Sequence, residues 1–493
     1  MEIAKKEVTG VKLLLGYLGL FMMLVGFIVL LPLLNLIFYP SEAHYAICFL
    51  VPGVASILVG FLLFLFIKKK DKGHLKRHQD AVLVVGVWII TILIAAMPFF
   101  MTGDYTFTQC MFEATSGFST TGLTIVDVDS LAKIFLLYRS IMLFFGGVGL
   151  VLILTSAISD AHGMQLYTAE GHSDKLLPNL KKSAQLIFSI YACYMVLGVI
   201  LYLICGMNFF DAFNHSIASF STGGFSTHSK SIGYYNSVSI EIVAMFLMLL
   251  GGTNYVIHFQ ILKAKFGKAF RHCEMKSIFI LLLIFVPLMS LNLMNSLAGY
   301  SGFWEAFRIS IFQFVSAITT TGFQTANSMN ALPPFFLLVL IVMMLLGGGI
   351  GSTSGGIKQY RFVVLVKGAY YHFRDKISNK RLVRTHYINR YGEKEVLTQK
   401  EYADTVSFTI LFIAIFLIGT FIFTAFGYSF SDSAFEIASS ISGVGLTLGI
   451  TGPNAHPIIH WTSMIEMFLG RLEIVVVYFA LYRIGCSATR KEI

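Results

Sequence analysis

Four short segments of the chain share a pattern that suits the binding of a metal cation by main-chain oxygen atoms. Each is centred on a glycine, with a hydroxyl side chain three positions before it and a polar side chain two positions after it. Glycine adopts backbone angles that are closed to other residues, so successive carbonyl oxygens can point at one axis. Rings of carbonyl dipoles can replace the hydration shell of a monovalent cation. The central glycines are Gly122, Gly224, Gly322 and Gly445.

The four segments are repeats of one longer pattern. A phenylalanine stands fifteen positions before each central glycine, and two small residues stand six and five positions before it. The central glycines are separated by 102, 98 and 123 residues, and the last spacing is longer because the connection over 358–403 is enlarged. One Thr-Thr-Gly-Leu-Thr alone would be a weak signal, but four copies in register are a strong one. The phenylalanines are Phe107, Phe209, Phe307 and Phe430.

Each segment is predicted to consist of a short helix followed by an extended return. The residues from the phenylalanine to the small pair make a helix roughly 18 Å long, which enters a bilayer but does not cross it. Backbone that returns at membrane depth is tolerated only where it is buried in protein or faces water. The returning segments are therefore predicted to line a pore, with the negative ends of the short helices aimed at the same place. The alternative is a set of re-entrant turns that only stabilise a transporter scaffold.

The composition excludes an ordinary soluble domain. Of 493 residues, 56% are hydrophobic and 13% are charged, and the mean hydropathy is +0.75, whereas soluble domains carry about 25% charged residues. The net charge of +10 does not indicate a nucleic-acid partner, because the basic residues lie between apolar runs and not on one water-soluble face. The six cysteines are scattered without a C-x-x-C pair, so they indicate neither a metal site nor a disulfide framework.

Ten apolar runs have the length that a membrane-crossing helix needs, which is about 20 residues. Lys and Arg concentrate in alternate connections, which hold 31 of the 36 basic residues, and the positive-inside rule therefore predicts that both termini are cytoplasmic. The runs are 11–38, 45–67, 81–100, 131–158, 183–205, 238–262, 277–297, 333–366, 405–426 and 458–482. The basic connections are 1–12, 68–80, 159–182, 263–276, 358–403 and 483–493.

The predicted fold is an all-α membrane protein. It has two extra N-terminal helices followed by four helix, pore-helix, filter, helix repeats around one pseudo-four-fold pore. Each glycine-centred segment follows an outward-going helix and precedes an inward-going one, so the repeats are parallel, unlike the inverted pairs of many secondary transporters. The N-terminal helices occupy 1–67, and the repeats occupy 81–158, 183–262, 277–366 and 405–482.

These repeats, with three further motifs, resemble the TrkH-type membrane subunits of the Trk/Ktr/HKT superfamily of potassium transporters. The motifs are G-M-Q-L-Y-T-A-E (163–170), G-G-G-I-G-S-T-S-G-G-I-K (347–358) and F-L-G-R-L-E (468–473). The match covers nearly the whole chain, including the two extra N-terminal helices. The resemblance implies potassium uptake across the cell (inner) membrane by a multi-pass protein, with potassium as the substrate and no organic cofactor in this chain.

The resemblance also implies which residues form the selectivity filter. All four central positions are glycine, which is similar to the potassium-favouring pattern of the superfamily. The fourth segment departs from the others, because Gly443 and Val444 stand where the first has two threonines. The implied filter residues are Thr120, Thr121, Gly122, Thr222, Gly223, Gly224, Thr320, Thr321, Gly322, Gly443, Val444 and Gly445.

The glycine-rich stretch over 347–358 is predicted to break the eighth apolar run, because each glycine lowers helix propensity by roughly 1 kcal/mol. It does not match the phosphate-binding G-x-x-x-x-G-K-[ST] pattern, so we expect no nucleotide there. The resemblance implies an intramembrane gate below the filter, and the alternative is a kink that allows close helix packing. The implied gate residues are Gly347, Gly348, Gly349, Gly351, Ser352, Thr353, Ser354, Gly355 and Gly356, together with Arg471.

Arg471 is a charge within an apolar run, and such residues usually face a cavity or a partner. The resemblance implies that it lies in the permeation path below the filter, where its charge opposes cation passage. The alternative is an ion pair with Glu466 or Glu473, although an offset of two residues places Arg471 and Glu473 on different helix faces.

Polar residues also recur on the short helices, nine positions before each central glycine. They are Glu113, His215, Gln313 and Glu436. Because the third copy is a glutamine, we expect a structural role and not a shared proton relay.

The resemblance implies two protein partners. TrkH-type proteins assemble as homodimers and are controlled by TrkA-like cytosolic nucleotide-binding subunits. This chain has no G-x-G-x-x-G fingerprint of its own, so regulation by nucleotide would come from such a partner. The basic stretch over 367–400 suits either a solvated cytoplasmic face or a docking surface.

Two other classes of membrane protein compete with this interpretation. An embedded enzyme would place polar groups in one cleft, and the chain has no H-E-x-x-H motif, no G-x-S-x-G motif and no paired carboxylates on one apolar run. An organic-solute or sodium-coupled symporter would more often show inverted repeats. A filter of the predicted kind serves a channel and an ion-coupled transporter alike.

Overall fold

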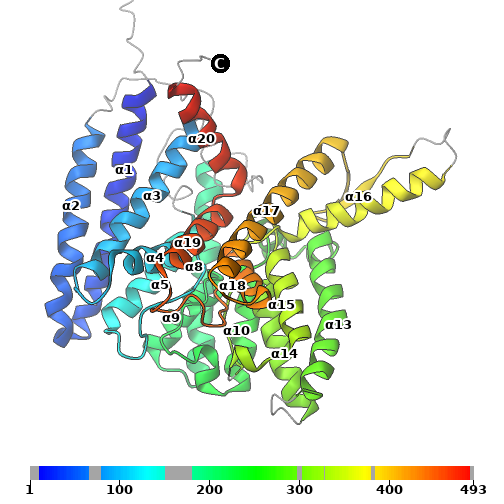
Figure 1. Ribbon diagram of the computed structural model, residues 1–493, viewed down its shortest axis with the longest axis horizontal. Helices are drawn as coiled ribbons and strands as arrows, with labels where there is room; N and C mark the ends of the chain where they lie inside the picture. The colour runs from blue at the N-terminus through cyan, green and yellow to red at the C-terminus, as the bar shows by residue number, and fades with distance from the viewer. Residues whose placement is uncertain are drawn as a thin grey trace, which may run out of the picture.

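The computed structural model describes residues 10–65, 79–149, 180–296, 302–326, 328–378 and 384–488. Across these ranges the protein is built of helices, with one two-stranded hairpin (Figure 1). Six described helices are long and apolar enough to cross a membrane, and one bent pair makes a seventh candidate. The predicted all-α membrane class is confirmed. The motif over 163–170 lies outside the described residues.

The two N-terminal helices form a tight antiparallel pair at one edge of the molecule (Figure 1). Helix α1 (Gly10–Leu30) continues into the 3-10 helix η1 (Leu31–Ile37), and η2 (Pro40–Tyr45) leads into α2 (Ala46–Phe64). A Cβ added at Gly60 would lie 2.6 Å from the carbonyl oxygen of Gly19, and Gly26 and Gly53 make a second close contact of this kind. Small residues thus allow the two backbones to meet, as is usual for helices that associate in lipid.

One carboxylate joins the N-terminal pair to the rest of the chain. Glu42, in η2, accepts hydrogen bonds from the backbone N–H groups of Lys133 (2.9 Å) and Ile134 (2.8 Å) at the start of α5 (Lys133–Val148). A carboxylate there satisfies N–H groups that have no partner within the helix and complements the positive end of the helix dipole.

The rest of the chain repeats one order of elements four times. The helices that come first in each repeat are named outward-going, and those that follow the short helices inward-going, after the orientation predicted from the sequence. The outward-going helices are α3 (Gln79–Phe100), α8 (Leu180–Ile204), α13 (Cys273–Met294) and α17 (Gln399–Ala425). The short helices are α4 (Phe107–Phe118), α9 (Phe209–Phe220), α14 (Phe303–Ile318) and α18 (Phe430–Ser442). The inward-going helices are α5, α10 (Val238–Gly251), α15 (Pro334–Leu346) and α19 (Pro457–Arg471). The connections contain η3 (Ser231–Tyr235), η4 (Met329–Ala331), α11 (Tyr255–Leu262), α12 (Phe266–Phe270), α16 (Gln359–Ile377) and α20 (Ile474–Ala488).

The short helices begin close to the expected phenylalanines. Three start at Phe107, Phe209 and Phe430, each after a side chain that caps the first turn, whereas α14 starts four residues before its phenylalanine, at Phe303. The caps are Thr106, Asn208 and Ser429, whose oxygens accept a backbone N–H of the first turn. In the third copy Gly302 stands at the cap, and the helix gains one additional turn.

Three of the inward-going helices are interrupted within the described residues, and the sequence predicts this only for the glycine-rich stretch. Helices α10 and α11 meet at a bend of 105°, and α19 and α20 are separated at Leu472 and Glu473, where Glu473 has φ +53°. The runs 238–262 and 458–482 are therefore not single straight helices. A Cβ at Gly146, Gly251 or Gly470 would strike a carbonyl oxygen in the last two residues of the neighbouring short helix, so these helices pass directly against the short helices.

The connection between the third and fourth repeats contains structure that the sequence does not predict. Strands β1 (Tyr387–Arg390) and β2 (Glu393–Val396) pair antiparallel, with Arg390 opposite Glu393. Helix α16 projects away from the helix bundle on the side opposite α1 and α2 (Figure 1).

The glycine contacts between α1 and α2 predict a difference between two matched substitutions. Gly60→Ala should lower the free energy of unfolding by about 1 to 3 kcal/mol, because its Cβ meets backbone that moves only with the whole helix. Gly86→Ala, in α3, has nothing within 4 Å of the added Cβ and should leave stability unchanged or slightly raised. Thermal unfolding in detergent checks both variants, and equal midpoints would contradict the packing described.

Candidate functional site

The four glycine-centred segments meet in a closed ring within one polypeptide. A Cβ added to each central glycine would collide with a carbonyl oxygen of the next segment, and the fourth segment meets the first in the same way. No side chain can therefore be accommodated at any of the four positions. The contacts run from Gly122 to Gly223, from Gly224 to Thr321, from Gly322 to Val444 and from Gly445 to Thr121.

The four segments also share one backbone conformation. The residue two positions before the central glycine has φ of 56°, 50°, 53° and 63° in the four copies, and the central glycines have φ of 88°, 64°, 87° and 96°. Threonine occupies the first of these positions three times at a cost in strain, and Gly443 occupies it in the fourth copy without that cost. The departure of the fourth segment in sequence is therefore not a departure in backbone conformation.

Two glutamates on the short helices hold the returning backbone after the central glycine. Glu113 accepts hydrogen bonds from the Thr124 hydroxyl (3.0 Å) and the Ile125 N–H (3.2 Å). Glu436 accepts them from the Thr447 hydroxyl (2.6 Å) and the Leu448 N–H (2.7 Å). Both carboxylates are fully buried, so these bonds fix the return at a set distance from its short helix.

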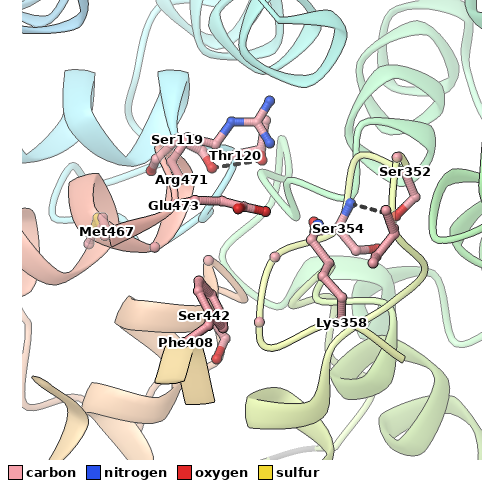
Figure 2. Close-up of a pocket in the computed structure, with 16 residues that line it drawn as sticks. Ser119, Thr120, Ser352, Ser354, Lys358, Phe408, Ser442, Met467, Arg471 and Glu473 are labelled. Atoms are coloured by element: carbon pink, nitrogen blue, oxygen red, sulfur yellow. Dashed lines mark hydrogen bonds between the residues drawn. The ribbon is translucent and has the colours of Figure 1, made fainter. Parts of the chain in front are cut away.

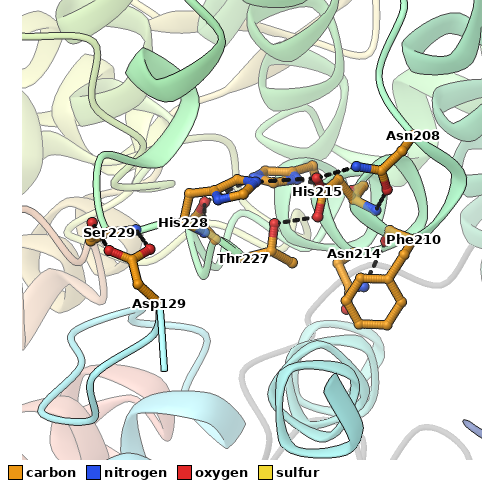
Figure 3. Close-up of polar contacts among 10 residues, drawn as sticks. Asp129, Asn208, Phe210, Asn214, His215, Thr227, His228 and Ser229 are labelled. Atoms are coloured by element: carbon orange, nitrogen blue, oxygen red, sulfur yellow. Dashed lines mark hydrogen bonds and ion pairs between the residues drawn. The ribbon is translucent and has the colours of Figure 1, made fainter. Parts of the chain in front are cut away.

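In the second segment a histidine makes the corresponding contact. His215 Nε2 lies 2.9 Å from the Ser226 hydroxyl, and its Nδ1 lies 2.9 Å from the Asp211 carbonyl oxygen. Asp211 in turn accepts a hydrogen bond from Thr227 (2.6 Å) and lies 3.2 Å from His228 Nε2 (Figure 3). Among the described residues, the amide of Gln313 in the third segment has no hydrogen-bond partner.

Arg139 connects the first two segments. Its Nε donates to Glu113 Oε1 (2.7 Å), its Nη1 donates to the Ser226 carbonyl (3.2 Å), and its guanidinium lies 3.9 Å from the centre of the Phe225 ring. The side chain is 2% exposed, so the ion pair is shielded from water. A second pair, Arg308 with Glu241 at 2.7 Å, joins the third short helix to the second inward-going helix.

The glycine-rich loop, residues 347–358, passes beneath the ring and contacts three of its four segments. The Ser354 hydroxyl donates to the Thr319 carbonyl (2.7 Å), and the Gly355 N–H donates to the Thr320 hydroxyl (2.8 Å). The Thr353 hydroxyl lies 3.1 Å from the Phe220 carbonyl and 3.0 Å from the Thr222 hydroxyl. In the fourth segment, a Cβ at Gly355 would strike the Ser442 carbonyl.

A cavity lies between the loop and the ring, and charged side chains line it (Figure 2). The ring contributes Thr120 and Gly443, which are the positions of positive φ in the first and fourth segments. The loop contributes Ser352 and Ser354 to Gly356, and the charged residues are Lys358, Arg471 and Glu473.

Arg471 lies in the lining of this cavity and reaches toward the first repeat. Its guanidinium donates to the Gly146 carbonyl, and Glu473 is bound by Arg361 at 2.9 Å. Lys358, whose amine donates to the Ser354 carbonyl, is a second cation in the lining.

The structure therefore brings together all of the residues expected in the filter and the loop. It adds Arg139, Glu241, Arg308, Lys358 and Glu473, which the sequence did not single out as part of the site. Each of these residues is charged and lies within or beside an apolar run of the sequence. A charge in such a place is costly without a partner, and this is the signal by which the sequence could have indicated them.

Comparison with known proteins assigns this architecture to a class. The family model TrkH, described as a cation transport protein, matches residues 49–484. The structure also matches the crystal structure of the potassium transporter TrkH from Vibrio parahaemolyticus, with a TM-score of 0.83 and 24% sequence identity. The match covers 96% of this chain and 98% of that one, which establishes a shared fold.

The chain belongs to the TrkH family of membrane cation transport proteins, and it is not an enzyme. It is 30% identical over 98% of its length to an uncharacterized cation transporter, MJ1485, from Methanocaldococcus jannaschii, and covers 97% of that protein. It is 29% identical over 92% of its length to the Trk system potassium uptake protein TrkH of Escherichia coli, and covers 95% of it.

The buried contacts predict that substitutions at the position nine residues before the central glycine change stability by different amounts in different segments. Glu113→Gln should destabilise the protein by about 3 kcal/mol, because it leaves the buried Arg139 without its counter-charge. Gln313→Met, at the same position of the third segment, should be neutral or slightly stabilising, because it removes a polar group that has no partner among the described residues. Thermal unfolding of the purified variants measures this difference, and a larger loss for Gln313→Met would contradict it.

Proposed function

We propose that this protein takes up potassium ions across the cell membrane through the ring formed by the four glycine-centred segments. The observation that carries the proposal is the closed contact of each central glycine with a carbonyl of the next segment. Such a ring places main-chain oxygens of four segments around one axis, and carbonyl oxygens substitute for the water of a dehydrated potassium ion. The names of the TrkH relatives, as potassium uptake proteins, support the choice of ion.

The proposed filter consists of three residues from each segment, and the proposed repeats are 81–158, 183–262, 277–366 and 405–482. The first residue and the central glycine of every segment have positive φ, a conformation open to glycine that allows the carbonyls of a segment to point at one axis. The filter residues are Thr120 to Gly122, Thr222 to Gly224, Thr320 to Gly322 and Gly443 to Gly445.

The proposed gate is the glycine-rich loop together with Arg471. The loop lies under three segments of the ring, and its hydrogen bonds to the ring itself are single hydroxyl and N–H contacts that can exchange for water. The backbone N–H groups of Gly349 and Thr353 also donate to the carbonyls of Gly252 and Gly251, outside the ring. Arg471 and Lys358 both line the cavity, where positive charge opposes the passage of a cation.

The proposed assembly is a homodimer in the inner membrane with both termini in the cytoplasm, controlled by a TrkA-like nucleotide-binding subunit. The name "Trk system" of the relatives supports a multi-component system. The start of α1 and the end of α20 lie at the same end of the molecule (Figure 1).

The direct test is potassium-limited growth and rubidium uptake in a bacterial strain that lacks its own potassium transporters. The chain should restore uptake, and uptake should be inhibited by excess potassium. Restored accumulation of an organic solute, with no effect on rubidium, would instead place the chain among solute symporters.

Two glycines of the fourth segment provide a matched pair for the filter. Gly445→Ala should reduce uptake by about tenfold or more, because its Cβ meets the Thr121 carbonyl and each 1.4 kcal/mol of lost ion binding is worth a factor of roughly ten. Gly443→Ala should retain most of the uptake, because an added Cβ there makes only ordinary contacts, 3.6 Å and longer, and threonine adopts the same conformation in the other segments. Equal losses in the two variants would argue against the filter.

For the gate, Thr353→Val removes the hydroxyl contacts to the second segment while keeping the shape of the side chain. We expect rubidium uptake to rise severalfold, because the loop then makes fewer hydrogen bonds to the ring above it.

Arg471→Ala should raise the single-channel current by removing a positive charge from the cavity. Unchanged flux in both variants, at normal expression, would overturn the gate.

A further inference from the structure

The β1–β2 hairpin in the connection between α16 and α17 has a short tip with a defined register. Arg390 pairs with Glu393, so the turn consists of Tyr391 and Gly392 alone, and both have positive φ (51° and 81°). Two-residue turns with two positive φ angles match the twist of a hairpin and fix its register. Ile388 is 1% exposed and packs with Cys273, Tyr360 and Val364, which anchors the base of the hairpin.

The tip packs against the end of the second repeat and the connection that follows it. The Tyr391 hydroxyl accepts a hydrogen bond from the Asn254 amide (3.3 Å), and its carbonyl accepts one from Gln260 (3.0 Å). The Tyr391 ring lies 5.1 Å from the His272 ring. A Cβ at Gly392 would lie 2.7 Å from that of Lys268, so the backbone of the tip is in direct contact with α12.

The residues that receive the tip also hold the glycine-rich loop. Asn254 is the nearest neighbour of Gly351, and the Tyr255 N–H beside it donates to the Gly351 carbonyl (3.3 Å). Glu274, whose carboxylate is 3.6 Å from His272, accepts the Ile350 N–H (2.8 Å). The hairpin tip and the loop thus both contact one buried polar cluster, made of Asn254, His272 and Glu274, and they do so from different sides.

The opposite side of the hairpin is open to the cytoplasmic solvent in the described chain. All four residues of β2 are exposed, and Tyr387 and Val396 are 43% and 51% exposed. Helix α16, which leads toward the hairpin, begins at Gln359, directly after the loop ends. A displacement of the hairpin is therefore transmitted to the loop in two ways, through α16 and through the polar cluster.

We propose that the hairpin over 387–396 is the cytoplasmic lever of the gate, and that Tyr391 is the positioning residue that keeps the glycine-rich loop beneath the ring. Withdrawal of the tip releases the loop. This inference rests on the proposed gate and adds the place at which regulation enters.

The test compares two tyrosines of the same hairpin in the full-length protein in lipid. Tyr391→Ala should raise rubidium uptake into proteoliposomes by about fivefold, the size of a modest allosteric coupling, with the selectivity between rubidium and sodium unchanged. It should also speed amide hydrogen exchange within 347–358 and leave the exchange of the short helices unaffected. Tyr387→Ala, at the far end of the hairpin, should match the wild type in both measurements, and Tyr391→Phe, which keeps the ring but loses the hydroxyl, should lie between.

The outcomes separate this inference from the proposed gate. If Thr353→Val changes the flux and both Tyr391 variants match the wild type in flux and in exchange, the lever is wrong and the gate stands. If changes within the loop itself leave the flux unaltered, the gate fails first and the lever fails with it. An equal effect of Tyr387→Ala on flux and exchange would also overturn the role of the tip.

Discussion

The structure depends on four places where a glycine lies so close to a neighbouring carbonyl that no side chain can enter. Each contact joins one segment to the next, and the fourth returns to the first, so the ring is complete only when all four are made. Main-chain polar groups at membrane depth are costly unless they are buried in protein or face a water-filled path. The four short helices and the interrupted inward-going helices exist in this arrangement because they supply that enclosure.

Around this common ring the repeats are supported by different chemistry. The first and fourth returns are held by glutamates, the second by a histidine, and the first is joined to the second by the buried Arg139. Such contacts fix the distance between a short helix and the strand that follows it, without contributing a group to the ring itself. The backbone is thus nearly four-fold symmetric, whereas the side chains behind it are not. Beneath the ring the described repeats differ, because the third interrupts its inward-going helix with a loop of twelve residues, 347–358, whereas the second and fourth do so within two or three residues.

Much of this arrangement is encoded locally and could be predicted. The central glycines, the hydroxyl three positions earlier and the phenylalanines that start three of the short helices are visible because the pattern recurs at a fixed offset. The loop was predictable because five glycines within 347–355 cannot continue a helix. The roles of the filter and loop residues remain predictions, although the structure brings these residues together.

Other features depend on contacts between distant parts of the chain, which a single sequence does not reveal. Arg139 binds Glu113, 26 positions away, and Ser226, 87 positions away, and nothing in the sequence selects these partners. The interruptions in the runs 238–262 and 458–482 arise where Gly251 and Gly470 pass against short helices of the fold. The hairpin at Tyr391 has a turn sequence without the usual Asn-Gly or Asp-Gly, and it is defined by its contacts with Asn254 and His272.

The central claim is that main-chain oxygens of the four segments bind a dehydrated alkali ion on one axis. Anomalous diffraction from crystals of the full-length protein grown in rubidium salts tests it most directly. The account predicts a rubidium peak enclosed by the carbonyl oxygens of Thr121, Gly223, Thr321 and Val444. Strong rubidium peaks elsewhere in the protein, with none inside this ring, would contradict it.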